Sequence, residues 1–405
     1  MFQGRFTIKK FFVFWTSQAF SLAGSAVVEF ALAWYLTKTT GKATVLATAL
    51  LVALIPPIIL GPFIGPLIDR WNRKKIMIIS DASIALLTVV LVMLFYTKTI
   101  EVWHLYAVMA ARSIGQTFQS PAMQASVPNI VDQKHLTRAA GLTQTLSGII
   151  SIAAPPAGAF LMEALPMQGV LSIDIITAVF AIGILFFLKI PQPERTTLSV
   201  KLNIIRDMVQ SMRYIWSTFG IRIMVLMVSI YCFFATPAYN LFPMLVNNHL
   251  GGDVLKLGWL NMMFGVGMIA GGLVLGAWGG FKKRILTSAS GSSLQGLLMI
   301  VLGFTTLNLY PMTLVCLFLV GVGVSFASAP LSAILNSVVA KDMQGRVFST
   351  MGSISSAMVP LGLAVAGPLA DATDVKVVYF IAGTILLITM PLGLLSRSQR
   401  DYEKT

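Results

Sequence analysis

The sequence predicts an all-α polytopic membrane protein with twelve transmembrane helices in two six-helix, pseudo-symmetric bundles. Three observations lead to this fold class. Hydrophobic residues make up 56% of the 405 residues and charged residues only 11%, far below the roughly 25% that is typical of soluble domains. Apolar stretches long enough to cross a hydrocarbon core of about 30 Å recur along the whole chain. Landmarks of the first half also return in the second half.

Each expected span is an apolar stretch between polar or charged segments. The first stretch is too long for the core of a signal peptide and lacks a small-residue cleavage pattern, so we expect it to stay as a membrane anchor. The spans are expected near residues 11–36, 44–68, 76–96, 103–123, 139–162, 168–190, 221–246, 255–279, 285–304, 311–334, 348–371 and 374–396.

Lys and Arg are concentrated on one side of the expected helices. With both termini inside, 23 of the 29 lie in cytoplasmic segments or their flanks and five lie in outer loops. The positive-inside rule then predicts a multi-pass protein of the inner (cytoplasmic) membrane with both termini in the cytoplasm. The same distribution accounts for the net charge of +14. We therefore expect the lipid bilayer, and no nucleic acid, as a partner.

The longest polar interval separates six expected spans from six. We expect an N-terminal bundle over residues 1–190, a cytoplasmic linker over 191–220 and a C-terminal bundle over 221–405. Within the linker, residues 201–216 alternate apolar with polar and charged side chains, which is the pattern of a helix lying on the membrane surface. The linker is expected to connect the two halves.

The two halves resemble each other in sequence, which indicates a duplicated six-helix unit. Such parallel repeats commonly hold a substrate site at their interface, near the middle of the bilayer. Three landmarks recur at nearly equal offsets of 209, 208 and 205 residues: Arg73–Ile76 and Lys282–Ile285, Arg138 and Arg346, and Pro155 and Pro360.

The loop after the second expected span carries a specific motif. It reads Gly-Pro-Leu-Ile-Asp-Arg-Trp-Asn-Arg-Lys-Lys over residues 65–75. This resembles the G-x-L-a-D-r-x-G-r-k signature that the major facilitator superfamily has between its second and third helices. Asn72 replaces the Gly of that signature, which we expect to be tolerated because Asn also adopts positive φ.

Two further patterns are similar to those of the same superfamily. Arg-Ser-Ile-Gly-Gln over residues 112–116 is similar to the R-x-x-q-G pattern of proton-coupled members. Ala-Pro-Pro-Ala-Gly over residues 154–158 is similar to the exporter pattern G-P-x-x-G, with Ala in place of its first Gly. Pro155 and Gly158 are the residues that match the exporter pattern.

Over its full length the sequence resembles the macrolide-efflux type of drug:proton antiporter. The resemblance rests on the loop at 69–77, Arg-Ser-Ile-Gly at 112–115, Lys-Arg-Ile-Leu at 283–286 and Gly-Arg-Val-Phe-Ser at 345–349. It implies the major facilitator fold and the proton-coupled export of amphipathic, drug-like molecules by alternating access. Macrolide antibiotics are the candidate substrates that it suggests.

The first motif can be interpreted physically as part of a gate. Asp69 ends the second helix at the membrane surface, where its charge could cap the positive N-terminus of a neighbouring helix. Arg70 and Arg73 could bind carbonyls or acids, and such contacts would exist in only one state of the gate. For the lysines that follow, we favour a simple role as positive anchors. The expected gating residues are Gly65, Asp69, Arg70, Arg73, Arg138 and Arg346.

Few ionisable side chains fall inside the expected spans, and each costs roughly 2.5–3.5 kcal/mol at the bilayer centre on insertion scales. Glu29 and Arg112 lie at depths that agree within about 3 Å, at about 1.5 Å per residue, so we expect an ion pair between them. In the fold that the resemblance implies, both helices line the central cavity. Glu29 is then the first candidate for the proton-carrying carboxylate, and a static structural pair is the alternative. Asp174 is the second candidate, although capping or packing near the membrane surface is the stronger interpretation for both Asp81 and Asp174.

The substrate cavity is expected to combine apolar surface with scattered polar groups. Aromatic and Met side chains supply large, adaptable apolar contacts, and amides in hydrocarbon need hydrogen-bond partners. Such a cavity suits a bulky amphipathic ligand, which would be cationic if it also contacts Glu29. Packing against lipid or core explains most of the aromatic residues. The expected cavity residues are Gln18, Gln116, Gln119, Tyr239, Asn240, Asn261 and Met262.

Several other functions are weighed against transport. No G-x-x-x-x-G-K-[ST] phosphate loop occurs in the sequence, so we expect no ATP-driven pump. An exporter or flippase of an endogenous lipid or siderophore is a close alternative. A membrane receptor or a lipid-processing enzyme would need large outer loops or a cluster of catalytic polar residues at one depth. We expect neither, and therefore no enzyme.

The remaining reactive side chains are expected to have structural roles. Cys232 and Cys316 lie in separate apolar segments without metal-ligand spacing, which favours inert buried thiols. The three histidines lie at helix ends or in loops and form no cluster. We therefore expect no metal site, no cofactor and no catalytic residue. The expected partners are protons and a small amphipathic substrate, and a monomer is expected.

Overall fold

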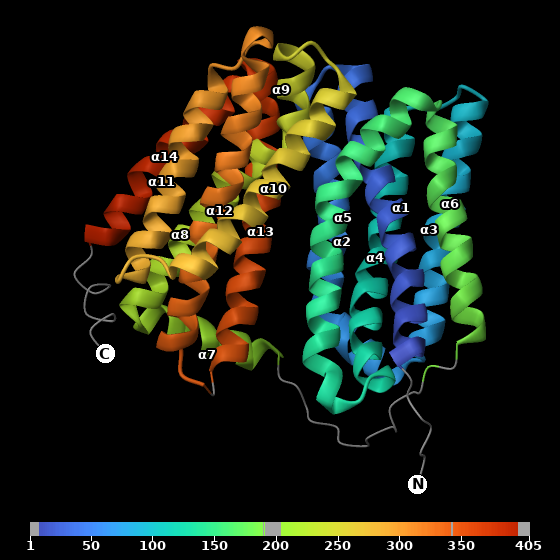
Figure 1. The fold of residues 1–405 in the computed structure, drawn as a ribbon, viewed down its shortest axis with the longest axis horizontal. Coiled ribbons are helices and arrows are strands. Elements are labelled where there is room, and N and C mark those ends of the chain that lie inside the picture. The colour runs from blue at the N-terminus through green and yellow to red at the C-terminus, as the bar shows by residue number, and fades with distance from the viewer. Residues whose placement is uncertain (1–7, 189, 191–203, 342, 396–405) are drawn as a thin grey trace. The chain divides into compact units, whose positions relative to one another are not determined.

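The protein is all-α and polytopic in the computed structural model, which describes residues 8–188, 190, 204–341 and 343–395 (Figure 1). Over these residues the chain forms α-helices and short 3-10 turns, and no strand. Ten of the described helices are long and apolar enough to cross a membrane. The other two expected spans are α4, which contains Arg112 and three glutamines, and α14, whose apolar part is the shorter stretch Val375–Thr389.

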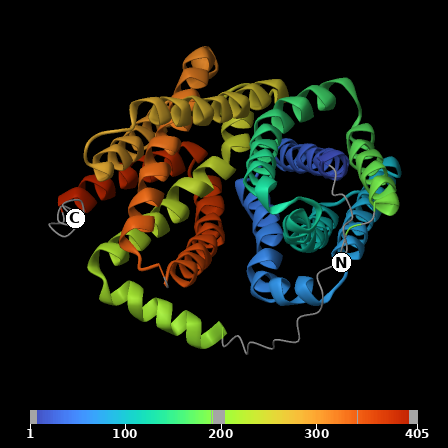
Figure 2. The ribbon, with the colours of Figure 1, turned by 60° about the horizontal axis from the view of Figure 1, so that its bottom comes forward.

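The chain divides into two compact units. Unit 1 comprises residues 1–36 and 49–198, and unit 2 comprises residues 37–48 and 199–405. Figure 2 shows the helices of each unit gathered into a bundle. The first six helices are α1 (Ile8–Thr40), α2 (Ala43–Arg70), α3 (Arg73–Tyr96), α4 (Val102–Ile130), α5 (Leu136–Ala164) and α6 (Met167–Phe187). The others are α7 (Ile204–Ser217), α8 (Phe219–Asn240), α9 (Phe242–His249), α10 (Val254–Trp278), α11 (Arg284–Gly303), α12 (Tyr310–Val338), α13 (Gln344–Ala372) and α14 (Val375–Leu395).

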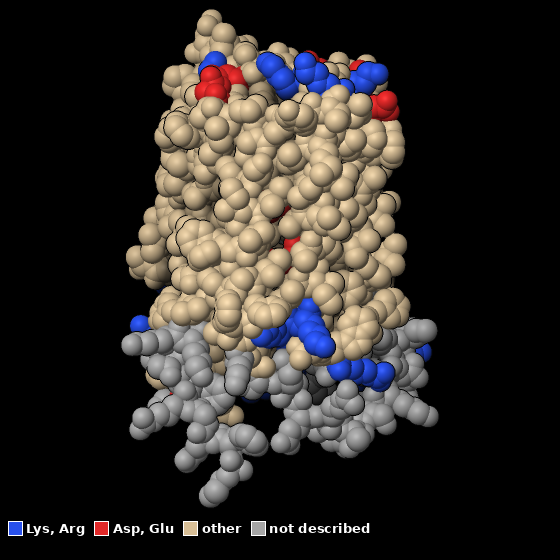
Figure 3. Space-filling model, turned by 90° about the vertical axis from the view of Figure 1, so that its right-hand side faces the viewer, with Lys and Arg blue, Asp and Glu red and all other residues tan. Residues whose placement is uncertain are grey.

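The Lys and Arg side chains on one face of the molecule lie near the ends of the helices (Figure 3). On the face that Figure 3 shows, Lys and Arg gather at the two ends, and a wide band without them lies between. A few acidic atoms show through this band. This is the distribution of a surface that meets hydrocarbon in the middle and water at both ends.

The seventh expected span, 221–246, is broken into α8 and α9. α8 ends at Asn240, and α9 begins at Phe242 with Pro243 in its first turn. Proline lacks a backbone N–H and its ring clashes with the carbonyl four residues earlier, so it disfavours a continuous helix and is well placed in a first turn. The expected single span is therefore wrong at this point, because Pro243 starts a new helix.

The turn between α2 and α3 differs from the expectation for Asn72. Asn72 has φ −71° and ψ 108°, and its side chain accepts a hydrogen bond from the amide of Lys75. It is thus the N-cap of α3, a role for which Asn is strongly preferred. The expected positive φ is wrong, because the side chain satisfies a free amide of α3 and needs an extended backbone to do so.

The amphipathic segment expected at 201–216 forms α7, from Ile204 to Ser217. Residues 201–203 lie outside the described part of the chain. Ile215 of α7 is buried with Ile221 and Val225 of α8 and with Val339 and Val347. The apolar face of α7 therefore covers one end of unit 2.

One pattern of helix pairing occurs in both units, which supports the duplication seen in the sequence. In unit 1, α3 packs against α4 and α6. In unit 2, α11 packs against α12 and α14. Counted as spans, the third helix of each half contacts the fourth and the sixth.

Unit 2 also contains the turn between α1 and α2. The carboxylate of Asp371 in α13 accepts hydrogen bonds from the amides of Ala43 and Thr44, at 2.6 and 2.8 Å. A charged acceptor at a helix N-terminus satisfies free amides and opposes the positive end of the helix dipole. Lys38 donates to the carbonyl of Gly252 at 2.9 Å. These contacts hold residues 37–48 within unit 2.

Candidate functional site

Three helices of unit 1 each carry two polar residues seven positions apart. Seven residues make nearly two helical turns, so each pair lies on one face and is separated by about 10.5 Å along the axis. α3 and α4 pack side by side, and the stripes on the three helices meet inside the unit as two polar layers. The pairs are Gln18 and Ser25 on α1, Asp81 and Thr88 on α3, and Arg112 and Gln119 on α4.

The first layer surrounds Asp81, which is 1% exposed. Its Oδ1 accepts hydrogen bonds from Ser21 Oγ at 2.8 Å and from Gln119 Nε2 at 2.5 Å. Its Oδ2 has no hydrogen-bond partner within the described part of the chain. Gln18, one turn before Ser21 on α1, is fully buried. Asp81 thus sits among neutral polar groups from two neighbouring helices.

The second layer surrounds Asp174 of α6 and contains an ion pair. Arg112 Nη1 lies 2.5 Å from Asp174 Oδ2, and the two side chains are 3% and 1% exposed. Thr88 Oγ1 lies 2.8 Å from the same carboxylate oxygen, and Ser25 Oγ donates to Asp174 Oδ1 at 2.9 Å. Arg112 also donates to Thr88. One residue from each of four helices therefore meets at this point.

Two glycines allow the helices to come this close. A Cβ on Gly24 of α1 would lie 3.3 Å from Asp174 Cα and would overlap the hydroxyl of Thr177. A Cβ on Gly115 of α4 would lie 2.9 Å from the side chain of Ile84 on α3. Because the side chains of Ser25 and Thr88 are short, they reach the carboxylate only when the backbones approach closely.

The expected ion pair between Glu29 and Arg112 is not the one that forms. Arg112 pairs with Asp174, and Glu29 is exposed and accepts a hydrogen bond from Gln116. A similar depth along the helix axes does not specify the direction in which each side chain points around its helix. Arg112 points into the core of unit 1, where an unpaired charge is costly, so it pairs with the buried carboxylate.

Asp81 and Asp174 are also placed differently from the stronger expectation. Capping or packing near the membrane surface is expected for both, yet each is buried inside unit 1 and accepts hydrogen bonds from other helices. Hydroxyls and an amide supplied by the facing helices compensate part of the cost of burying these carboxylates. Asp174 therefore belongs to the candidate site. Asp81 belongs to it as well, although only a structural role was expected for it.

The expected gating residues are not gathered in one place within the described residues. Arg73 is buried and donates to the carbonyl of Ala125 on α4 at 2.6 Å, in keeping with the expected binding of a carbonyl. Gly65 and Arg70 are exposed, and the side chain of Asp69 lies outside the described part of the structure. The gating role stays a prediction for these residues.

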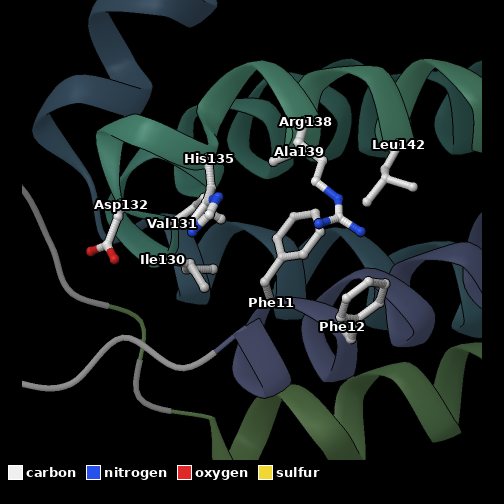
Figure 4. Close-up of a pocket in the computed structure, with 9 residues that line it drawn as sticks. All are labelled: Phe11, Phe12, Ile130, Val131, Asp132, His135, Arg138, Ala139 and Leu142. Carbon is white, nitrogen blue, oxygen red and sulfur yellow. The ribbon is translucent and has the colours of Figure 1, made fainter.

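The two later gating residues, Arg138 and Arg346, lie on separate units. Arg138 lines a small pocket of unit 1, and Figure 4 shows its guanidinium pointing toward the rings of Phe11 and Phe12. Arg346 of α13 donates to Gln210 of α7 at 3.1 Å. Neither contact tests a role in gating.

The exporter pattern of α5 lies against α1. Pro155 is inside α5, and a Cβ on Gly158 would lie 2.8 Å from the ring of Phe30. Gly158 therefore lets α5 pack tightly against α1, the helix that supplies Ser21 and Ser25 to the polar layers.

The residues expected in a substrate cavity fall into different environments. Gln18 and Gln119 are buried in the polar layers of unit 1, because the buried carboxylate needs hydrogen-bond donors. Gln116 lines an open concavity of about 460 Å³ between α2 and α4. In unit 2, the expected residues are half-buried: Tyr239, Asn240, Asn261 and Met262.

Two of these unit 2 residues have hydrogen bonds inside the unit. The hydroxyl of Tyr239 lies 3.2 Å from Oε1 of Gln295. The amide of Asn261 donates to the carbonyl of Leu257 on its own helix at 2.9 Å. Gln295 was not among the expected cavity residues. It is fully buried, and its Oε1 accepts a second hydrogen bond from the hydroxyl of Tyr231.

A signal for the missed residues of unit 1 is present in the sequence. Polar pairs with the same spacing of seven occur in three expected spans. Asp81 comes before Thr88 along the chain, whereas the partner of Asp81, Gln119, comes after the partner of Thr88, Arg112. Antiparallel neighbouring helices would bring such positions together. The serines of α1 give no such signal alone, because serine is common in transmembrane helices at packing contacts.

No metal-binding cluster is found among the described residues, in which three or more His, Cys, Asp or Glu side chains never gather. Cys232 is half-buried and Cys316 is buried, and both are free thiols. The two polar layers of unit 1 consist of buried carboxylates, the guanidinium of Arg112 and neutral hydrogen-bonding groups.

The chain is similar to known transport proteins along nearly its whole length. Residues 4–403 match the family described as Transmembrane secretion effector. Over 378 residues the chain is 33% identical to Macrolide efflux protein A of Streptococcus pyogenes, covering 93% of each chain. It is 24% identical to Multidrug efflux pump Tap of Mycolicibacterium fortuitum over 389 residues, covering 92% of this chain and 90% of that one. A solved structure of a bacterial homologue of the iron transporter ferroportin matches with a TM-score of 0.75 at 13% identity, over 98% of this chain and 99% of that chain.

Proposed function

Because the chain belongs to the Transmembrane secretion effector family of major facilitator transporters, we propose that it exports amphipathic, drug-like molecules, macrolides among them. The observation that carries this proposal is the 33% identity with Macrolide efflux protein A, which extends over 93% of both chains. The likeness to Multidrug efflux pump Tap supports a cargo of drug-like molecules more generally.

The proposal includes antiport driven by the proton gradient. The buried pair of Arg112 and Asp174 supports it, because a titratable carboxylate inside a membrane bundle commonly marks a proton pathway. Binding of a proton to Asp174 would remove the charge that holds the guanidinium of Arg112. The guanidinium would then need another partner, and a change in partner can favour one conformation over another.

The hydroxyls around Asp174 fit this role. Ser25 and Thr88 lie within hydrogen-bonding distance of the carboxylate, and hydroxyls can donate to a carboxylate or accept from a carboxylic acid. Asp81 is a second buried carboxylate, which lies about two helical turns from Thr88 on α3. Glu29 stays a further candidate on the exposed side of α1, where Gln116 holds its carboxylate.

The proposed setting is the cytoplasmic membrane, with both termini and the loop that joins α2 to α3 in the cytoplasm. Support comes from the Lys and Arg residues, most of which lie in the segments that this orientation places inside. Substrates would then be taken up from the cytoplasm or the inner leaflet and released outside. The chain would act as a monomer.

Accumulation of a radiolabelled macrolide in whole cells tests this proposal directly. Cells that produce the protein should hold several times less erythromycin than cells with an empty vector. A protonophore should remove the difference, because it collapses the gradient that drives export. Equal accumulation with and without the protein would contradict the macrolide assignment.

A gradient-independent result would contradict a different part of the proposal. Export that continues unchanged after the proton gradient is collapsed, against the concentration gradient of the macrolide, would exclude antiport with protons. Loss of erythromycin export with retained export of a lipid or siderophore would favour the endogenous-cargo alternative.

A further inference from the structure

We propose that a cavity inside unit 2, between α8, α11 and α12, binds an uncharged, mainly apolar molecule that carries a hydrogen-bond acceptor. The cavity measures about 270 Å³. This inference deepens the proposed function, since it rests on the molecule being cargo of the exporter and names the chemistry that unit 2 would recognise.

One face of each of the three helices lines the cavity. On α11 the lining residues follow helical spacing, with Ser288, Ser292 and Gln295 on the same side. α8 contributes Tyr231 and α12 contributes Ser328. More than half of the lining residues on α11 and α12 are Ser or Ala, so the space lies between these small side chains and Tyr231 of α8.

Close helix contacts keep this space from collapsing. A Cβ on Gly291 of α11 would lie 2.6 Å from the amide nitrogen of Ala327 on α12, and Ser288 donates to the carbonyl of Ala327 at 2.8 Å. α8 packs against α13, where a Cβ on Gly362 would overlap the carbonyl of Phe233. Each wall is thus fixed to a neighbour by backbone contacts, which favours a cavity that exists before the ligand binds.

Gln295 is fully buried in the wall of the cavity and orders the polar side chains around it. Its Oε1 accepts from the hydroxyls of Tyr231 and Tyr239, at 3.0 and 3.2 Å. Both tyrosines therefore present their hydroxyls to one amide oxygen and fix which end of the amide faces them. Its Nε2 makes one long contact of 3.4 Å with the carbonyl of Gly291. The exposed residue Ser328 lines the same cavity, and its hydroxyl can donate a hydrogen bond to an acceptor on the ligand.

The lining determines the charge and size of the ligand. None of the lining residues is charged, and most of the surface that they expose is apolar, so a cation would lose its hydration without gaining a partner. The volume lies between an engineered apolar cavity of roughly 150 Å³ that binds benzene and the roughly 300–1,000 Å³ of drug-sized sites. A neutral molecule of two or three fused rings fits these limits.

Binding of a neutral fluorescent coumarin tests the proposal. The probe is 7-diethylamino-4-methylcoumarin, which has a carbonyl acceptor, and ethidium serves as a permanently cationic comparison. Both are titrated into nanodiscs that contain the full chain, with empty nanodiscs as the blank. The coumarin should bind saturably, and ethidium should not compete with it. Displacement of the coumarin by ethidium would overturn the expected preference for a neutral ligand.

Adjacent residues on α12 provide a matched pair of variants. Ser328 lines the cavity and Ala329 does not, and both are exposed, so a larger side chain is tolerated at either. Ser328→Phe should raise the Kd of the coumarin at least tenfold, and Ala329→Phe should change it less than twofold. Equal Kd values for the two variants would contradict binding in this cavity.

Alkylation locates the ligand without relying on a loss of binding. In a background that carries Cys232→Ala and Cys316→Ala, Ser328→Cys and Ala329→Cys are treated separately with N-ethylmaleimide. The coumarin should slow alkylation at residue 328 at least fivefold and leave the rate at residue 329 unchanged. Equal effects at both positions would overturn the proposal.

Erythromycin export measured with the same protein separates the two proposals. If the wild type exports erythromycin but does not bind the coumarin, the cavity inference is wrong and the proposed function stands. If neither export nor binding is observed, the proposed function fails as well. Coumarin binding without erythromycin export would support a ligand site in unit 2 and contradict macrolide export.

Discussion

Asp174 is the residue at which most of the polar structure of unit 1 converges. Ser25 and Thr88 and the guanidinium of Arg112 come to it from three other helices. A buried ion pair contributes little net stability, yet removing one partner leaves the other charge uncompensated. A costly arrangement of this kind is retained where a change of charge has a use, and proton coupling is the use proposed here.

Asp174→Asn should both destabilise the protein and remove the dependence of export on external pH. The amide can keep the hydrogen bond from Ser25, but Arg112 is left without a counter-charge, which typically costs about 3–5 kcal/mol. The midpoint of thermal unfolding in detergent should fall, and export measured in everted vesicles should no longer respond to the imposed pH gradient.

Glu29→Gln is the matched control for that experiment. Glu29 is exposed and contacts a neutral amide, so we expect a change in stability within about 0.5 kcal/mol, as for most surface substitutions. If Glu29→Gln abolishes the pH response and Asp174→Asn preserves it, the assignment of the coupling carboxylate is reversed.

At the scale of helices, close backbone contact decides where the walls of unit 2 lie. A Cβ on Gly267 of α10 would overlap the carbonyl oxygen of Phe318 on α12. A Cβ on Gly321 of α12 would overlap the carbonyl oxygen of Phe264 on α10. Small residues at helix contacts are typical of membrane bundles, in which van der Waals packing drives association. A similar close contact, at Gly291, joins α11 to α12 beside the cavity.

Gly267→Ala should lower the stability of the protein by about 1–3 kcal/mol, because the added methyl group forces two backbones apart. Gly272→Ala on the same helix is the control, since a Cβ there meets nothing within 4 Å. It should leave stability unchanged or raise it by up to about 1 kcal/mol through helix propensity. Thermal unfolding in detergent measures both, and equal midpoints would contradict the tight contact.

At the scale of the whole molecule, the two units share a pattern of helix pairing but differ in what they bury. Among the described residues, the buried charged side chains are Arg73, Asp81, Arg112 and Asp174, and all four belong to unit 1. The buried polar residues of unit 2 are neutral, with Gln295 and several Ser and Thr. This difference is consistent with the two proposals made above, proton coupling in unit 1 and binding of a neutral ligand in unit 2.

The orientation of the whole chain can be tested by labelling from outside. In a background with Cys232→Ala and Cys316→Ala, Lys98→Cys lies between α3 and α4 and Lys282→Cys lies between α10 and α11. A membrane-impermeant maleimide added to intact cells should label residue 98 and should label residue 282 only after the cells are opened, since the positive-inside rule places 282 in the cytoplasm. The opposite pattern would reverse the proposed topology.

The amino-acid sequence by itself indicated the apolar spans, the all-α membrane fold and the family. Long apolar stretches have few stable alternatives to a membrane helix, because a buried backbone must satisfy its own hydrogen bonds. The motif over residues 65–75 indicated the superfamily, and the offset landmarks indicated a duplicated six-helix unit. Only local breaks escaped this reasoning, such as the one at Pro243, where one proline starts a helix of its own.

The tertiary structure decided which polar residues meet. Glu29 and Arg112 lie at similar depths, yet the rotation of each helix about its axis turned Arg112 toward Asp174 and left Glu29 exposed. Helix rotation depends on close contacts such as those of Gly24 and Gly115, and a single sequence does not specify which faces come together. Composition and length therefore fix the spans, whereas the partners of a buried charge depend on how the helices pack.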